Sequence, residues 1–380
     1  MRERSLVGSF EGARGLAALL VAVYHFRLLV PFGIAYPSAV QYGYLFVDLF
    51  FVLSGFVICA SYEARLDTSN DFRTFAIRRF GRLFPLLIAS TVAFIVAPDL
   101  LTMAKHAAIV LGHGNAFRNP QLAPYVEPRL VEIVATLTMT HGLGLFDKAV
   151  LNFASWSIST EFYTYLVFAG ICLLVSGRRR IVLFSVLSLV AFAVTCWASL
   201  VAHQCVATQD CMNITYDYGM PRCLTSFFLG CLVHHGARRM RAQGSLLQTV
   251  ALLALCGVFA AIGRVPEVAF ACPLVFALLI LSLSSDRGYL ARLLNTAPAQ
   301  LLGRRSYSIY LMHPVLIEVV GGTTHHFSGP TAGLAILAVY IVALVMVSGL
   351  TYRYVEAPFR DRFNRWARQQ EVAPVTTSAA

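Results

Sequence analysis

About ten apolar stretches, each close to 20 residues long, constrain this chain more than any other feature. They run near 13–31, 43–61, 82–98, 157–175, 181–201, 219–235, 246–263, 267–284, 305–321 and 331–352. A helix needs about 20 apolar residues to cross the roughly 30 Å hydrocarbon core of a bilayer. With 58% hydrophobic and 13% charged residues, the chain is predicted to be an all-α, polytopic membrane helix bundle of about ten transmembrane helices over residues 1–370. Residues 371–380 are expected to form a disordered tail.

The basic residues predict the orientation of the bundle, because cytoplasmic loops carry an excess of Lys and Arg. With a cytoplasmic N-terminus, all but seven of the 30 basic residues fall in cytoplasmic segments; the seven are Arg27, Lys105, Arg118, Arg129, Lys148, Arg222 and Arg264. Both termini are therefore predicted to be cytoplasmic. This asymmetry also explains the net charge of +11, which needs no nucleic-acid partner and adds attraction to anionic lipid.

The step from Arg14 to His25 marks the first stretch as a functional candidate. Eleven residues turn a helix by about three full turns and raise it by roughly 16 Å, so both side chains lie on one stripe at different depths. Ionisable residues inside a membrane are costly and usually face a protein interior or a water-filled path. The alternative is that Arg14 extends to the interface and His25 is a packing residue.

Two carboxylates are predicted at the outer to middle level of the membrane. Asp48 lies in FVDLFFVLSGF and Glu161 in WSISTEFYTYL, flanked by Trp156 and Tyr163. An isolated carboxylate there needs a partner or a catalytic role. His25 is the nearest candidate cation for Asp48, either as a structural pair or as a catalytic imidazole that the carboxylate orients.

Arginines gather at the opposite, inner side. In AIRRFGRLFP, Arg79 and Arg82 are three residues apart on one helix face, where they could clamp a phosphate together with Arg14. Positive-inside bias alone explains at least half of this signal. His313, just before Pro314, is predicted either to satisfy carbonyls freed by the proline kink or to line the path.

Three further expectations concern the loops. Residues 284–305 are expected to form an amphipathic helix on the inner surface, and the long outer segment 99–156 to contain short interfacial or re-entrant helices. Arg353 and Glu356 are predicted to form a structural ion pair.

The nine cysteines show no metal-ligand spacing, and no metal site or bound cofactor is predicted. Seven of them fall in or at the ends of apolar stretches, where they are ordinary packing residues. Cys205 and Cys211 instead share a polar outer loop, where an oxidising compartment would allow a disulfide.

Taken in order, the motifs resemble the acyltransferase 3 family of integral-membrane O-acyltransferases, which includes bacterial enzymes that acetylate O-antigen and other envelope sugars. The resemblance spans roughly residues 5–362, through the Arg-x10-His step, FVDLFFVLSGF, RRFGRLFP, WSISTEFYTYL, RRSYSIYLMHPV and RYVEAPFR. Each motif alone is weak, but the ordered set is specific. Some relatives carry a C-terminal hydrolase-like domain, for which this chain is expected to have no room.

The resemblance implies that acyl-CoA, expected to be acetyl-CoA, enters from the cytoplasm. It also implies that a glycan hydroxyl at the outer face of the bacterial inner membrane receives the acyl group. It implies that His25 is the catalytic histidine and that Glu161 is the motif glutamate. As a mechanistic hypothesis, Asp48 or Glu161 is expected to orient His25. The donor site is assigned to Arg14, Arg79, Arg82, His313 and Tyr310, and the acceptor side to Trp156 and Tyr163. His25 would act as general base or as a transient acyl carrier.

Two other functions remain open from the residues alone. A proton-coupled transporter or flippase would use His25, Asp48, Glu161 and His313 as a relay. An acyltransferase acting on a small molecule, such as a macrolide, would share the donor site and differ only in the acceptor.

Overall fold

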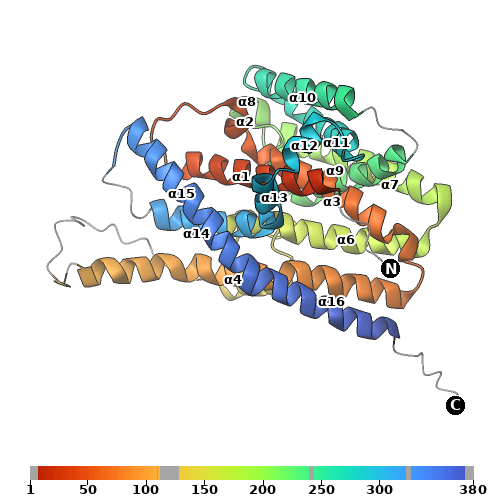
Figure 1. The fold of residues 1–380 in the computed structure, drawn as a ribbon, viewed down its shortest axis with the longest axis horizontal. Coiled ribbons are helices and arrows are strands. Elements are labelled where there is room, and N and C mark those ends of the chain that lie inside the picture. The colour runs from red at the N-terminus through yellow and green to blue at the C-terminus, as the bar shows by residue number, and fades with distance from the viewer. Residues whose placement is uncertain (1–6, 109, 112–127, 239–243, 322–326, 373–380) are drawn as a thin grey trace, which may run out of the picture.

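The helices of the bundle account for all the regular structure in residues 7–108, 110–111, 128–238, 244–321 and 327–372, which the computed structural model describes (Figure 1). The long helices are α1 (Gly8–Leu29), α3 (Phe46–Tyr62), α4 (Ser69–Ala108), α6 (Trp156–Leu174), α7 (Gly177–Trp197), α9 (Gly219–Ala237), α10 (Gly244–Ala261), α11 (Cys272–Leu283), α14 (Ser306–Gly321), α15 (Pro330–Thr351) and α16 (Ala357–Val372). The short ones are α2 (Ser38–Gln41), α5 (Leu130–Leu137), α8 (Cys205–Thr208), α12 (Tyr289–Leu294) and α13 (Ala297–Arg304). Short 3₁₀ or π segments connect or extend them: η1 (Gly43–Leu45), η2 (Glu63–Arg65), η5 (Phe153–Ser155), η6 (Ala198–Ala202), η7 (Pro266–Ala271) and η8 (Tyr352–Glu356).

Seven helical segments of the described chain are long and apolar enough to cross a membrane. The predicted all-α membrane bundle is confirmed at that level. The three remaining predicted spans are helical too, as α9, α10 and α14, but do not meet both criteria by themselves. The figure of ten spans and the cytoplasmic termini stay predictions, and most of the predicted tail lies outside the described residues.

Helices α3 and α9 pack at backbone contact through two glycines. A Cβ atom added at Gly55 would lie 1.9 Å from the carbonyl oxygen of Phe227, and one at Gly230 would lie 2.0 Å from that of Val52. Small residues allow such close approach between membrane helices, where packing rather than the hydrophobic effect drives association. These two positions therefore fix the distance between α3 and α9.

Replacing Gly230 with leucine is expected to prevent folding, because the new side chain meets backbone that cannot move aside. The matched control is Gly257→Leu, since a Cβ atom at Gly257 has no neighbour within 4 Å. Monodispersity and thermal unfolding in detergent measure both. Equal behaviour of the two variants would show that the α3–α9 contact does not control folding.

The segment predicted as one surface helix is instead two short helices, α12 and α13, packed against α1. The helical structure is interrupted at Asn295 and Thr296, and Pro298 lies in the first turn of α13. Leu294 is buried, and a Cβ atom on Gly12 would lie 2.2 Å from its carbonyl oxygen. The prediction of one continuous helix was wrong, because the segment divides into two helices that pack on α1. Its position on the inner membrane surface stays a prediction, and Leu293 remains exposed.

The start of α1 is held by Asp286, which accepts hydrogen bonds from the backbone N–H groups of Gly8 and Ser9 at 3.2 and 3.0 Å. A carboxylate at this position satisfies donors that have no partner within the helix. Burial alone would raise the pKa of Asp286, but these bonds and one from Asn295 hold it below its usual value. These hydrogen bonds to Asp286 fix the position of the first turn of α1 and therefore the position of Arg14 on that helix.

Helices α15 and α16 form one long rod that crosses α4, as Figure 1 shows in blue over orange. The wider turn η8 joins them. Such π-helical turns often occur at functional sites because they redirect side chains. Here η8 points Glu356, which is buried, into the bundle.

Candidate functional site

His25 of α1 and His313 of α14 form a hydrogen-bonded pair of imidazoles near the middle of the bundle, with their ring planes tilted by 32°. Nε2 of His313 lies 3.1 Å from Nδ1 of His25, and the ring centroids are 4.9 Å apart. His313 is fully buried, whereas His25 is partly accessible. The two residues are 288 positions apart in sequence, so the fold alone brings them together.

The hydrogen bonds assign the proton positions on the two rings. Nδ1 of His313 lies 2.6 Å from the carbonyl oxygen of Tyr310, which only accepts, so this nitrogen carries the proton. Its Nε2 then accepts from Nδ1–H of His25, which is also 3.0 Å from the carbonyl oxygen of Val21. Since a neutral imidazole has one N–H, Nε2 of His25 holds the free lone pair. Within the described chain this atom makes no hydrogen bond.

Phe153 in η5 packs against both histidine rings, at 5.0 Å from His25 and 5.9 Å from His313. A buried polar network holds η5 in place: Ser155 Oγ lies 2.9 Å from Nε2 of His141, and Asn152 donates to the carbonyl oxygen of Leu311 at 3.0 Å. Burial lowers the pKa of His141, despite hydrogen bonds to backbone that raise it. This network positions Phe153 against the histidine pair, and no local sequence pattern indicated it.

Asp48 does not contact His25, and the expected Asp–His pair was wrong. Its carboxylate accepts from Nη2 and Nε of Arg222 at 2.7 and 3.0 Å and from Ser226 at 2.9 Å. Both charged side chains are completely buried. A buried carboxylate requires a fully hydrogen-bonded cation, and guanidinium supplies more donors than imidazole.

Arg222 was counted from the sequence only among the basic residues that lie outside the cytoplasmic segments, and it was given no partner there. Its remaining donors reach the carbonyl oxygens of Ile214 and Tyr44. Tyr44 also donates to the carbonyl of Cys211, and Cys211 is joined to Cys205 by a disulfide. The ion pair therefore ties α3 and α9 to the disulfide-closed loop.

Glu161 of α6 lies toward the arginines rather than beside His25. It accepts from the hydroxyl of Tyr165 at 2.5 Å, and that hydroxyl also contacts Ser54 at 2.7 Å. Arg82 is within electrostatic range of Glu161. In the described residues no hydrogen bond links Glu161 to either histidine, so the expectation that it orients His25 directly was wrong.

The three arginines predicted to bind the donor keep most of their N–H groups unused. The nearest charged partner of Arg14 is Glu11, at 3.9 Å. Arg79 donates to Tyr62 at 3.1 Å, while its buried Nε has no partner. Arg82 makes no hydrogen bond or ion pair to a described residue. Among the described atoms of these arginines, Nε of Arg79 is buried without an acceptor, which is costly. The other unused donors are accessible to water, and an anionic ligand could bind them in its place.

Glu356 closes this arginine cluster and was assigned wrongly from the sequence. It accepts a hydrogen bond from Ser308 at 2.8 Å and lies within electrostatic range of Arg82 and Arg14. Arg353, its expected partner, is exposed and stacks on Tyr354 instead. The turn η8 separates the two side chains.

The other predicted site residues divide between these two clusters and the core. The hydroxyl of Tyr310 bonds Ser157 at 2.8 Å, next to the histidine pair. Trp156 is buried under the guanidinium of Arg222, 5.6 Å from its ring centre. Tyr163 donates to the carbonyl of Thr138 at 3.0 Å. Trp156 thus packs on the ion pair, and Tyr163 ties α6 to the segment after α5.

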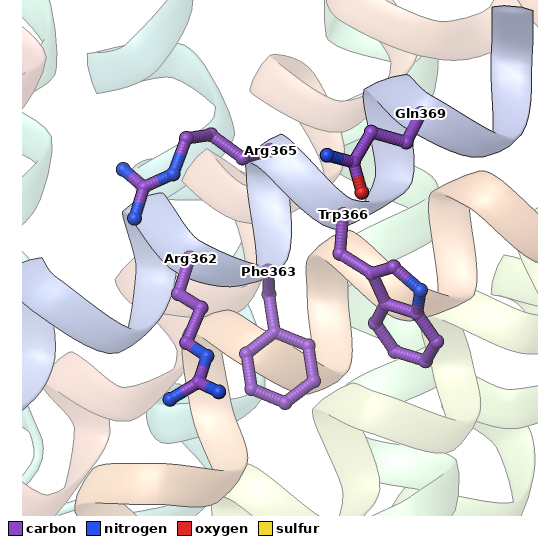
Figure 2. A pocket seen from close by; sticks show the side chains of 5 residues that line it. All are labelled: Arg362, Phe363, Arg365, Trp366 and Gln369. Atoms are coloured by element: carbon purple, nitrogen blue, oxygen red, sulfur yellow. The ribbon is translucent and has the colours of Figure 1, made fainter.

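A pocket of about 540 Å³ lies on α16, lined by Arg362, Phe363, Arg365, Trp366 and Gln369. Figure 2 shows Phe363 and Trp366 extending from the same side of the helix, with Arg362 beside Phe363 and Arg365 extending away from both rings. Phe363 also packs against α4, where a Cβ atom on Gly81 would lie 2.1 Å from it. The pocket therefore adjoins the α4 segment that carries Arg79 and Arg82.

Comparison with known proteins extends over nearly the whole chain. A family model described as an acyltransferase domain matches residues 7–353. The chain is 23% identical over 380 aligned residues to the peptidoglycan O-acetyltransferase OatA of Listeria monocytogenes, covering 94% of this chain and 56% of that protein. It is 22% identical over 386 residues to the O-acetyltransferase OatA of Staphylococcus aureus, covering 93% and 57%. The chain thus spans a little over half the length of these relatives. No solved structure matches it.

Proposed function

The chain belongs to the acyltransferase 3 family, and from that premise we propose that it transfers an acetyl group from cytoplasmic acyl-CoA to a hydroxyl of an envelope glycan. The donor is a substrate and not a resident cofactor. In this proposal the protein lies in the cytoplasmic membrane, with the arginine cluster toward the cytoplasm and the histidine pair deeper in the bundle. Membership of the family shows that the protein is an acyltransferase. The identity of the donor, the identity of the acceptor and the side of the membrane that each occupies are what we propose.

One observation carries the proposal: α1 presents Arg14 to the arginines with unused donors and His25 to the histidine pair. The two positions are about 16 Å apart along the helix, of the order of a pantetheine arm. Phosphates of the donor would neutralise Arg14, Arg79 and Arg82, since guanidinium groups bind phosphate through paired hydrogen bonds. The thioester would then reach His25.

At the histidine end, Nε2 of His25 takes the proton of the acceptor hydroxyl as its oxygen attacks the thioester carbonyl. The C–S bond breaks, and coenzyme A leaves as the thiolate that receives this proton. His313 accepts from Nδ1–H of His25 and so keeps Nε2 in the basic form. The same atom would carry the acetyl group if transfer proceeds in two steps.

A transporter is less well supported, because Asp48 is neutralised by Arg222 and does not extend a relay from His25. For the acceptor, the Listeria relative is named for peptidoglycan, which favours peptidoglycan over O-antigen.

Mass analysis of envelope fractions from cells with and without the protein tests the acceptor. We expect muropeptides to gain the mass of an acetyl group. If the acetyl group is instead found on O-antigen, exopolysaccharide or a small molecule, the acceptor is wrong and the transferase stands. No acetylated product in any fraction would overturn the function.

Replacing Arg82 with alanine is expected to raise the KM for acetyl-CoA by about 10- to 100-fold, since a charge-assisted hydrogen bond is worth roughly 1.5–3 kcal/mol. Its kcat should change little because the histidine pair remains. Arg73→Ala is the control, as Arg73 is exposed on the same helix. Steady-state kinetics in detergent measure both; a loss confined to kcat would contradict the donor role.

The α16 pocket is expected to hold the nucleotide end of the donor, with the adenine against Trp366. Replacing Trp366 with alanine should weaken the binding of acetyl-CoA by about 5- to 100-fold, because base stacking on an aromatic ring contributes roughly 1–3 kcal/mol. Acetyl-pantetheine, which lacks the nucleotide, serves as the control donor. If the affinities for both donors fall equally, Trp366 supports the structure of the site and does not contact the adenine.

A further inference from the structure

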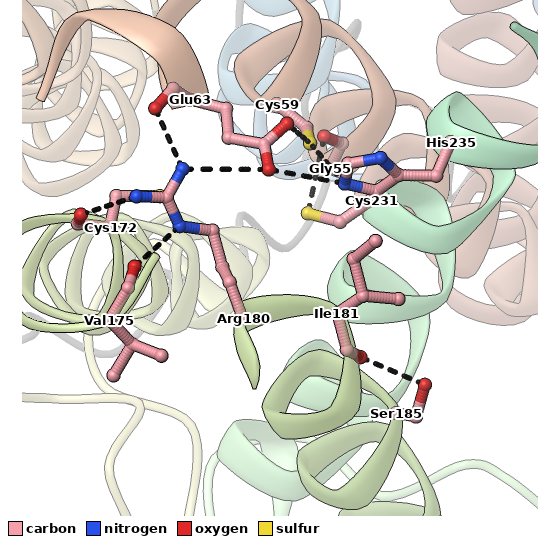
Figure 3. Close-up of polar contacts among 10 residues, drawn as sticks. All are labelled: Gly55, Cys59, Glu63, Cys172, Val175, Arg180, Ile181, Ser185, Cys231 and His235. Atoms are coloured by element: carbon pink, nitrogen blue, oxygen red, sulfur yellow. Dashed lines mark hydrogen bonds and ion pairs between the residues drawn. The ribbon is translucent and has the colours of Figure 1, made fainter. Parts of the chain in front are cut away.

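A second polar cluster lies where α3, α7 and α9 meet and shares no residue with the histidine pair or the arginine cluster. It contains Cys59 and Glu63 from α3 and η2, His234 and His235 from α9, and Arg180 from α7. Figure 3 shows the side chains of Glu63, His235 and Cys59 converging, with Arg180 on the other side of the carboxylate. Acyl transfer has no use for these groups.

The donor atoms are spaced as ligands of one small ion would be. Sγ of Cys59 lies 3.4 Å from Oε2 of Glu63 and 3.9 Å from Nε2 of His235. Nε2 of His235 is 3.2 Å from Oε1 of Glu63. A ring nitrogen of His234 also lies within 4.8 Å of the Cys59 and Glu63 ligand atoms. Bonds of about 2.0–2.3 Å in a tetrahedral zinc site place ligand atoms roughly 3.5 Å apart.

The surroundings match those of a metal ligand set. Oε1 of Glu63 is 3.6 Å from Nη1 of Arg180, which leaves Oε2 for the side facing Cys59. Arg180 itself is fixed by the carbonyl oxygens of Cys172, Val175 and Glu63. Such outer partners orient coordinating carboxylates. The Glu63 and His235 side chains are 15% and 18% exposed, so an ion can enter.

We propose that Cys59, Glu63, His235 and His234 bind a divalent transition-metal ion of the Zn²⁺ class. Thiolate, imidazole and carboxylate together suit zinc and its neighbours rather than Mg²⁺ or Ca²⁺. Binding releases the thiol proton of Cys59 to solvent, and the thiolate and carboxylate balance the ion's charge. The ion links α3 to α9 across residues 176 positions apart, which is why sequence spacing did not reveal it.

The competing account is an ion-pair network complete without metal, in which His235 and Arg180 both neutralise Glu63. The two accounts differ in what the whole purified protein does with added metal. The experiment therefore titrates chelator-stripped, reduced protein in detergent with Co²⁺ as a spectroscopic probe and measures Zn²⁺ by competition with a chromophoric chelator.

We expect about one ion per chain and a thiolate-to-cobalt charge-transfer band. Cys59→Ser should abolish the band and lower the affinity for Zn²⁺ at least tenfold. His235→Gln should lower the Zn²⁺ affinity comparably and keep the band, by analogy with the 10- to 100-fold losses of affinity at metal-site partners. The control is Cys196→Ser, which removes a thiol of α7 outside the cluster. Absence of binding by the wild-type protein, or a band that survives Cys59→Ser and disappears in Cys196→Ser, would overturn the proposal. The His235→Gln variant keeps the test valid if Cys59→Ser does not fold.

Discussion

Replacing His25 with alanine is expected to lower kcat by about 10²- to 10⁴-fold, the range that a positioned general base contributes. The KM for the acyl donor should stay near its wild-type value, because Arg14, Arg79 and Arg82 are untouched. A transient acyl carrier at His25 would give at least as large a loss. Initial rates of acetyl transfer by the purified protein measure this, with thermal unfolding as the check on folding.

Two variants of His313 separate orientation from chemistry. Glutamine at 313 offers an amide oxygen that can still accept from Nδ1–H of His25, whereas leucine cannot, so His313→Leu should lose more activity than His313→Gln. His203→Ala is the neutral control, since His203 pairs with Asp217 outside the histidine pair. Full activity of His25→Ala would contradict its role as the general base. Equal losses in the two His313 variants would contradict the assigned proton positions.

Replacing Asp48 with asparagine is expected to destabilise the protein by about 3–5 kcal/mol, the cost of leaving a buried charge without its partner. The guanidinium of Arg222 would remain completely buried, with only carbonyl oxygens and a neutral amide around it. Unfolding in detergent, followed by temperature or denaturant, measures this loss. Asp361→Asn is the control, because the Asp361 carboxylate is exposed and pairs with the half-buried Arg360, and solvent-accessible pairs contribute about 0–1 kcal/mol.

The double variant Asp48→Leu with Arg222→Met then tests the role of Asp48. Apolar replacement of both members of a buried ion pair is often neutral or stabilising, so we expect stability and acetyl transfer to recover together. A double variant that folds as well as wild type and yet is inactive would indicate that Asp48 has a catalytic role besides its structural one.

Local periodicity predicted some of these features well. The placement of Arg14 and His25 on one stripe of α1 follows from helix geometry, and the apolar stretches gave the helical bundle. Arg79 and Arg82 were predicted to face an anion for the same reason, and their unused donors are consistent with that role.

Long-range pairing could not be predicted in the same way. The partner of His25 is His313, and that of Asp48 is Arg222, each more than 170 positions away. Depth in the membrane suggested Asp48 beside His25, but depth does not say which face of a helix meets which neighbour. Glu356 was misassigned because the wide turn η8 rotates it away from Arg353, and nothing in the local pattern indicates that turn.

The most direct test of the account reconstitutes the protein in sealed vesicles, with labelled acetyl-CoA on the side of the arginine cluster and a peptidoglycan fragment on the other side. We predict acetyl ester on the fragment with wild-type protein, and almost none with His25→Ala or without acetyl-CoA. Acetylation that persists in His25→Ala, or movement of the fragment across the vesicle membrane with no acetyl transfer, would contradict the central claim.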